Sequence, residues 1–285
     1  MVQEAYTLKY FVKEKEADEG SLYLSLFLSQ GTCHYAIFNR HSMQLIEMAD
    51  IHVHDQFVTE QALVDMLAML VHNQFLDQKK FDKVDICFLN NRFTLIPEAF
   101  TEQNDMKGLL SFSSGVDAGF KTAGHKLPYC DFYYATKPEW LDFFGKTFPN
   151  ANIRHAGAVS IALMFEQQSL NDKDIYLAIH PVQLEIVVKK GKALQFYNVF
   201  SYESKEDILY YLLFCMEQWH LNPLLCKMAV AANTETTDDL IRSIRKYVKQ
   251  VDFVVCDATV LANSRNYQLG QHYYFTVLNQ HLCAL

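Results

Sequence analysis

The fold is decided by three consecutive runs of residues: Asp174-Ile-Tyr-Leu-Ala-Ile-His180, Val182-Gln-Leu-Glu-Ile-Val-Val-Lys189 and Ala193-Leu-Gln-Phe-Tyr-Asn-Val-Phe200. The runs are rich in Ile, Val, Leu, Phe and Tyr, which are enriched in β-strands. His180-Pro181 separates the first run from the second, and Lys189-Lys-Gly-Lys192 separates the second from the third. Short β-rich runs with such breaks predict a meander of three antiparallel strands.

A helix and further strands follow the meander. Ser204-Lys-Glu-Asp207 has the pattern of a capping box, in which Ser and Asp serve the unpaired N–H groups of a helix start. Asn222-Pro223 ends this helix, because proline cannot continue it. The apolar stripe of the helix consists of Ile208, Leu212, Cys215, Met216 and Trp219. Strands are expected over residues 227–232 and 251–256, with a helix between them.

The same order of elements occurs earlier in the chain. Strands are expected near residues 22–28, 33–39, 43–49 and 84–89, with a helix capped by Thr59 before the last of them. A βββαβ unit therefore appears twice, which is the pattern of an internal duplication. The predicted organisation is a polar arm over 1–19, a first subdomain over 20–170 with an inserted segment at about 98–150, and a second subdomain over 171–285.

The segment between the two units has its own pattern. Residues 111–119 are rich in Ser and Gly and predict a loop, and Pro138 opens a short aromatic helix. Residues 155–168 contain many small residues, so we expect a helix that packs closely against another element. A closing helix is expected over residues 270–285.

Composition restricts the function. The chain has 285 residues, half of them hydrophobic, and a net charge of −8, which argues against bulk nucleic acid or anionic membrane as a partner. No apolar run reaches the ~20 residues of a membrane span, and the first residues lack the features of a signal peptide. Seven scattered cysteines, with no Cys-x-x-Cys, predict buried thiols in a reducing cytoplasm.

Two βββαβα halves joined by a small-residue helix resemble the superfamily of actin, sugar kinases and heat-shock ATPases, which has ribonuclease-H-like domains. His155-Ala-Gly-Ala-Val-Ser160, followed by 174–180 and Leu184-Glu-Ile-Val-Val188, is similar to the crossover into the second domain of that superfamily. More closely, the whole chain resembles an uncharacterised bacterial family of domains of unknown function with an actin-like fold. The resemblance implies an α/β fold with two ribonuclease-H-like halves in the actin-like ATPase arrangement.

The resemblance also implies a nucleotide site, from which this sequence departs. Superfamily ATPases place Asp-x-Gly-Thr between the first two strands of each half, and Gly-Gly after the fourth strand of the second half. The positions that correspond here are Ser29, Gln30, Gly31, Thr32, His180, Pro181, Ala232 and Asn233. Both carboxylates and the Gly-Gly are missing, and proline removes a backbone donor. We therefore expect no catalytic residues and no bound nucleotide, and favour a protein that is not an enzyme.

His52 and His54 are candidate metal ligands. In an extended segment both imidazoles point to the same side, which suits one metal ion. The alternative is a polar strand end without metal, which we favour because no third ligand is identified; Asp77 and Asp85 are possible neighbours. No metal is therefore predicted.

Other chemistry is weaker still. The sequence has neither a Gly-x-Ser-x-Gly elbow nor a Walker-type loop, and Cys33 beside His34 opens a predicted strand. A basic set on one helix, formed by Arg242, Arg245, Lys246 and Lys249, is read as a solvated face. The many aromatic residues leave room for an exposed surface that binds a partner.

Three functions stay open. The first is a cytoplasmic scaffold that binds another protein or itself, without catalysis. The second is a divergent nucleotide-dependent phosphotransferase or ATPase that uses Thr32 and an acid from elsewhere in the chain. The third is a sensor of an unknown small ligand. The loss of all three nucleotide turns argues against the second function and does not separate the other two.

Overall fold

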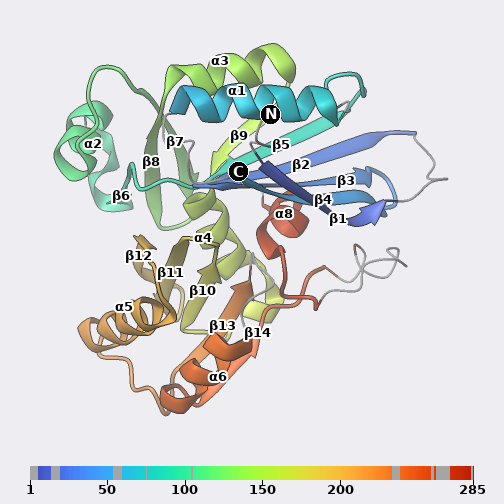
Figure 1. Cartoon of the computed structure of the whole chain (residues 1–285). Helices are drawn as coiled ribbons and strands as arrows, with labels where there is room; N and C mark the ends of the chain where they lie inside the picture. Colours follow the sequence, from blue (N-terminus) through green and yellow to red (C-terminus); the bar gives the residue numbers. More distant parts are fainter. Residues whose placement is uncertain are drawn as a thin grey trace. The chain divides into compact units, whose positions relative to one another are not determined.

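The computed structural model divides the chain into two compact units. The first unit is formed mainly by residues up to His155, and the second begins at Ala156 (Figure 1). The structure describes residues 6–13, 20–53, 60–74, 76–103, 105–232, 238–257, 260, 270–283 and 285. Each unit is described separately below.

The first unit contains a six-stranded sheet with the strand order β1-β4-β3-β2-β5-β9. Strands β2, β3 and β4 form an antiparallel meander, as the sequence predicts. Strand β5 lies parallel to β2, β9 lies parallel to β5, and β1 pairs antiparallel with β4. The strands are β1 (Tyr6–Lys13), β2 (Leu22–Ser29), β3 (Thr32–Asn39), β4 (Leu45–Val53), β5 (Lys83–Phe88) and β9 (Asn152–His155).

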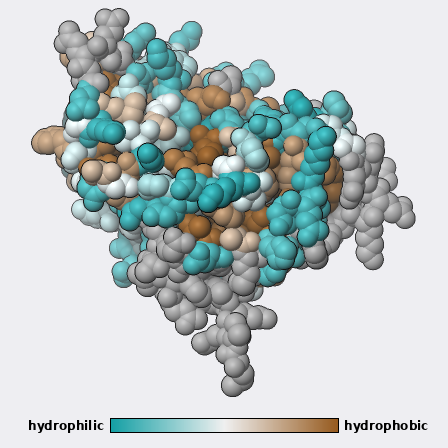
Figure 2. Space-filling view, turned by 90° about the horizontal axis from the view of Figure 1, so that it is seen from above, coloured by the Kyte–Doolittle hydropathy of each residue, from teal (hydrophilic) through white to brown (hydrophobic). Residues whose placement is uncertain are grey.

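Helices α1 (Glu60–Asn73) and α3 (Pro138–Thr147) cover one face of this sheet (Figure 1). Leu24 and Ile86 of the strands pack there against Leu67 of α1 and Phe144 of α3. Figure 2 looks down on the side where these helices lie and shows brown hydrophobic surface between teal hydrophilic strips. The opposite face of the sheet carries polar residues, which form the clusters described below.

An inserted three-stranded sheet, with the order β6-β8-β7, lies between β5 and α3 in the sequence. It is formed by β6 (Phe93–Pro97), β7 (Lys121–Leu127) and β8 (Cys130–Thr136), with the helices η1 (Glu98–Gln103) and α2 (Met106–Ser114). Asp105 caps the start of α2 and Gly115 ends it with φ 63°. The predicted loop over 111–119 is therefore wrong in its first part, because the Ser residues complete a capped helix. The predicted insertion of about 98–150 overlaps this sheet but also includes α3.

The second unit has a five-stranded sheet with the order β12-β11-β10-β13-β14. The meander β10–β11–β12 is again antiparallel, and β13 and β14 continue it in parallel. The strands are β10 (Ile175–Ile179), β11 (Gln183–Lys190), β12 (Ala193–Ser201), β13 (Lys227–Ala232) and β14 (Gln250–Phe253). The helices are α4 (Ala156–Glu166), η2 (Gln168–Leu170), α5 (Lys205–Gln218), α6 (Asp238–Tyr247), α8 (Phe275–Asn279) and η3 (Gln280–Leu282).

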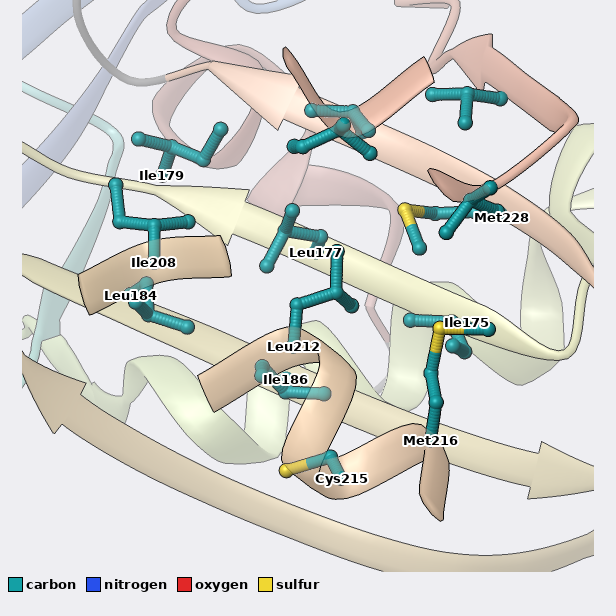
Figure 3. Packing of buried hydrophobic residues seen from close by; sticks show 14 of the residues in the cluster. Ile175, Leu177, Ile179, Leu184, Ile186, Ile208, Leu212, Cys215, Met216 and Met228 are labelled. Carbon is teal, nitrogen blue, oxygen red and sulfur yellow. The ribbon is translucent and has the colours of Figure 1, made fainter. Parts of the chain in front are cut away.

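The core of the second unit lies between its sheet and the helices α5 and α6. Figure 3 shows Leu177 of β10 and Ile186 of β11 facing Leu212 and Met216 of α5. The Ser204 hydroxyl accepts from Asp207 N and the Asp207 carboxylate accepts from Ser204 N, so the predicted capping box is confirmed. This cap holds the apolar stripe of α5 over the strands.

The two sheets share one strand order, since β4-β3-β2-β5-β9 matches β12-β11-β10-β13-β14 position by position. The predicted strands are confirmed in both sheets, although β4 covers Leu45–Val53 rather than 43–49. Three other differences follow. Residues 6–13, expected in a polar arm, form β1 because they pair with β4 and bury Val12. Strand β14 ends at Phe253, short of the expected 256. The closing helix is also short, because residues before Phe275 bridge to β13 instead.

Candidate functional site

The turn between β2 and β3 occupies the position of the first phosphate turn in the resemblance. Gly31 has φ 77° and closes the hairpin, in which Ser29 pairs with Thr32. The Ser29 hydroxyl is buried and has no hydrogen-bond partner within the described part of the chain. A hydroxyl thus stands where the superfamily has a carboxylate for a metal ion.

Thr32 belongs to a polar cluster around Asp50, which we call the Asp50 cluster (Thr32, His34, Asp50 and His52). Thr32 Oγ1 lies 2.8 Å from His34 Nε2 and 3.3 Å from Asp50 Oδ1. His34 Nε2 lies 3.4 Å from Asp50 Oδ1, and His52 Nε2 lies 3.0 Å from Asp50 Oδ2. The Thr32 hydroxyl is also 3.2 Å from Ile51 O. The Thr32 hydroxyl therefore already has hydrogen-bond partners within the chain.

The two candidate metal ligands are only partly placed. The His52 side chain is 48% exposed beside Asp50, whereas His54 lies outside the described residues. Asp77 pairs with His72 at 3.1 Å. Among the residues that the structure describes, no group of three or more His, Cys, Asp or Glu is arranged to hold a metal ion. Cys33 is buried, and burial, with a smaller effect of Asp50, raises the pKa of its thiol.

Asp85, a possible neighbour of His52 by sequence, instead forms a buried ion pair. Its Oδ1 lies 2.8 Å from Arg154 Nη2, and its Oδ2 lies 3.0 Å from Lys83 Nζ. Tyr23 donates to Asp85 Oδ2 at 2.9 Å. Burial, followed by the charge of Asp85, raises the pKa of Tyr23 well above its ordinary value. We call these four residues the Asp85 cluster; in it two cations face one carboxylate.

The turn between β10 and β11 leads into a second buried cluster. His180 Nε2 lies 2.8 Å from Glu185 Oε1, and both side chains are fully buried. Glu185 Oε2 accepts from Ser160 at 3.1 Å and from Tyr197 at 2.8 Å. We call His180, Glu185, Ser160 and Tyr197 the Glu185 cluster. The backbone of the turn is also paired, because His180 N donates to Gln183 O at 2.9 Å and Tyr202 donates to His180 O.

Helix α4 reaches this cluster through its small residues. A Cβ on Gly157 would lie 2.4 Å from the Tyr197 ring, so only glycine permits this approach. Ser160, one turn further along α4, then contacts Glu185. The predicted close packing of the small-residue helix is therefore confirmed.

The end of β13 corresponds to the adenosine turn in the resemblance. Ala232 N donates to His272 O at 2.8 Å, and Tyr274 N donates to Ala232 O at 2.7 Å. Ala231 and Ala232 are completely buried, and Asn233 lies outside the described residues. Both backbone groups of Ala232 are thus occupied by residues 272–274.

The remaining sequence candidates have structural partners. On α6, Arg242 pairs with Asp239 and Arg245 donates to Val251 O at 3.2 Å, as expected for a solvated face with local contacts. Ser114 donates to Phe93 O at 2.9 Å and fastens α2 to β6. The sequence analysis missed the Asp85 and Glu185 clusters. Their signal was a carboxylate at an interior position of a strand rich in apolar residues, Asp85 in Lys83–Phe88 and Glu185 in Gln183–Lys190.

Comparison with solved structures defines the class of protein as one with an actin-like ATPase fold. A Bacteroides thetaiotaomicron protein with this fold and unknown function matches with a TM-score of 0.70 and 18% identity, over 82% of this chain and 91% of that chain. A structure of the PilM–PilN type IV pilus biogenesis complex matches with a TM-score of 0.58 and 10% identity, over 91% of this chain and 97% of that one.

The chain belongs to the family described as "Protein of unknown function (DUF3822)", whose sequence profile matches residues 13–251. No curated protein matches the chain. Membership of a family of unknown function with an actin-like fold confirms the closer resemblance drawn from the sequence. Within the described residues, no helix has the length and apolar character that crossing a membrane requires.

Proposed function

We propose that this protein is a non-catalytic member of the actin-like class and acts by binding another protein or a second copy of itself. The observation that carries this proposal is the pairing of Ala232 with residues 272–274. Nucleotide binding in this fold needs free backbone at the end of the fourth strand, and here both Ala232 groups are already bonded. The Pro181 turn supports the same conclusion, since it lacks one donor and its His180 groups are paired.

Three further points belong to this proposal. We infer a cytoplasmic location, with which the seven free and buried cysteines agree. The shared strand order of the two sheets supports an origin by duplication, with subdomains over residues 20–170 and 171–285. The net charge of −8 argues against nucleic acid as the partner.

One observation favours a second candidate, a divergent phosphotransferase or ATPase. Asp50 Oδ1 lies 3.3 Å from Thr32 Oγ1, beside the turn where a carboxylate is otherwise missing. Asp50 is therefore a possible replacement for the lost metal-binding acid of the first unit. Against this role, both of its oxygens already face histidines, at 3.4 Å and 3.0 Å.

Thermal unfolding with and without millimolar Mg-ATP tests the choice between the two functions. A ligand at 100 times its dissociation constant adds about 2.7 kcal/mol of stability. We expect no shift and no phosphate release. A shift that disappears in Asp50→Asn and in the double variant Gly31→Val with Thr32→Ala would support the second candidate and overturn the first. A shift without phosphate release would indicate a nucleotide sensor.

A further inference from the structure

The edge strand β12 differs from the other sheet edges in the described part of the structure. It has nine residues, Ala-Leu-Gln-Phe-Tyr-Asn-Val-Phe-Ser, with neither charge nor proline. Exposed edges are normally protected by charge, proline or shortness, because their unpaired backbone groups attract other strands. The other edges have such protection: Lys9 in β1, the short length of the four-residue β9, Asp252 in the four-residue β14, Pro97 in β6, and Lys121 and Lys126 in β7.

Two amide side chains of β12 bond to the backbone of their own strand. Asn198 Oδ1 accepts from Val199 N at 2.9 Å, and Gln195 Nε2 donates to Ala193 O at 3.4 Å. Val199 N points away from β11, because its partner Glu185 belongs to the residues of β11 that bond towards β10. The flexible amide side chain of Asn198 thus stands where a neighbouring strand would bond.

A continuous set of aromatic side chains lies beside this edge, on the side of α5. Ring centroids lie 5.9 Å apart for Trp219 and Phe196, 6.4 Å for Phe196 and Phe200, and 4.5 Å for Phe200 and Tyr211. The series continues through Tyr210 to Phe214, which are 63% and 44% exposed. We call these six residues the aromatic surface. Aromatic residues of this kind are enriched at protein interfaces.

The two ends of β12 carry opposite charge. Lys190 and Lys192 are exposed at the turn before β12, whereas Glu203 and Glu206, with Lys205 between them, are exposed after it and leave that end with a net negative charge. None of these four side chains forms an ion pair within the described residues. A strand that runs antiparallel to β12 starts beside the acidic end of β12 and finishes beside its basic end. It therefore pairs favourably when it is basic at its own start and acidic at its own end. The β12 strand of a second copy has this distribution of charge.

We propose that β12 pairs antiparallel with β12 of a second copy, which gives a symmetric dimer with one sheet continuous across both chains. A pairing centred on Tyr197 sets Gln195 opposite Val199 of the second copy, so that a backbone group of the second copy replaces the Asn198 side chain as the partner of Val199 N. Lys190 and Lys192 then lie beside Glu203 and Glu206 of the second copy. Helix α5 and its aromatic surface meet their copies across the twofold axis, as an isologous interface requires. This inference deepens the interaction role proposed above and rests on it.

Charge reversal tests the proposal without touching the core. We expect the full chain to be dimeric in analytical ultracentrifugation, and Lys190→Glu with Lys192→Glu to weaken the dimer about tenfold or more. Glu203→Lys with Glu206→Lys should weaken it similarly. An equimolar mixture of the two double variants should form a heterodimer, which native mass spectrometry detects. A dimer that both double variants leave unchanged would overturn the proposal.

The aromatic surface supplies a matched pair of variants. Tyr210→Ser with Phe214→Ser should weaken the dimer, whereas Phe112→Ser, at a residue 93% exposed in the inserted segment, should not. Unchanged circular dichroism confirms that each variant is folded. A wild-type chain that is monomeric at 100-fold varied concentration would also overturn the proposal. That outcome would not affect the proposed non-catalytic role, because the Mg-ATP experiment tests that role separately.

Discussion

In the first unit a carboxylate on β5 is buried between two cations, whereas in the second unit a carboxylate on β11 is buried between a histidine and hydroxyl groups. Asp85 faces Arg154 and Lys83 at 2.8 Å and 3.0 Å. Glu185 faces His180 at 2.8 Å and accepts from Ser160 and Tyr197. The strand order of the two sheets is the same. One topology therefore supports two ways of burying an acid, by full charge pairing or by a network of donors.

The largest effect is expected when the Asp85 cluster loses its buried cation. Arg154→Ala leaves a buried carboxylate beside the partly exposed Lys83 and the hydroxyl of Tyr23, and breaking such a pair costs about 3–5 kcal/mol. Urea unfolding measures the loss. Lys83→Ala is the control and should cost at most about 1 kcal/mol. A double change to Asp85→Leu and Arg154→Met should recover most of the stability, because it removes both charges together.

The apolar face of the second sheet should give the next largest effect. Ile186 is the neighbour of Glu185 on β11 but points to the opposite face, against Leu212 of α5 (Figure 3). Ile186→Ala or Leu212→Ala should cost about 2–4 kcal/mol in urea unfolding, since each opens a cavity in a packed core. Leu224→Ala, at a residue 59% exposed, is the matched control and should be close to neutral. Equal losses at Leu224 and Ile186 would contradict this assignment of the core.

Glu185→Gln should have a smaller effect than Arg154→Ala. The amide keeps the shape of the side chain but sets its NH₂ group against donors, so an unsatisfied pair costs about 1–3 kcal/mol. The exposed Glu217→Gln should stay within about 0.5 kcal/mol of the wild type. If Glu185→Gln lowered the free energy of unfolding more than Arg154→Ala, the donor network around Glu185 would stabilise the fold more than the ion pair of Asp85, contrary to this prediction.

The smallest expected effect concerns acid sensitivity in the first unit. Burial, with a smaller effect of Arg154, lowers the pKa of His125 to about 4, and its ring stacks on Tyr134 at 5.3 Å. The unfolded chain, with an ordinary pKa near 6.5, binds more protons than the folded chain between pH 6.5 and 4. The contribution of His125 is thus complete above pH 6.5 and is lost as the pH falls towards 4.

Urea midpoints at pH 7 and pH 5 measure this loss. His125→Gln should reduce the difference between the two midpoints, whereas His41→Gln, in an exposed turn, should leave it unchanged. A larger difference in His125→Gln than in the wild type would contradict the sign of the effect.

The sequence predicted the positions of the strands in both meanders because alternation and turn residues are local signals. Val182–Lys189 shows this plainly, since His180-Pro181 and Gly191 mark both ends of its strand. Strand β1 was missed because its lysines, such as Lys9, made the first residues resemble a solvated arm. The pairing of Asp85 with Arg154 was missed for a different reason: it depends on the parallel contact of β5 with β9, which no local pattern encodes. The nucleotide turns were located from the resemblance. The contact of Thr32 with Asp50 was not predicted, because Asp50 lies on another strand.

The bridge between Ala232 and Tyr273 shows that a segment of the chain itself competes with any ligand for the backbone of Ala232. A tethered segment acts at an effective concentration that reaches the millimolar range. A free molecule can bind to the Ala232 backbone only after residues 272–274 have detached from it. Its observed association rate would then stop rising with concentration and level off at the opening rate of the segment. Such a plateau in stopped-flow kinetics would distinguish displacement from binding elsewhere on the protein.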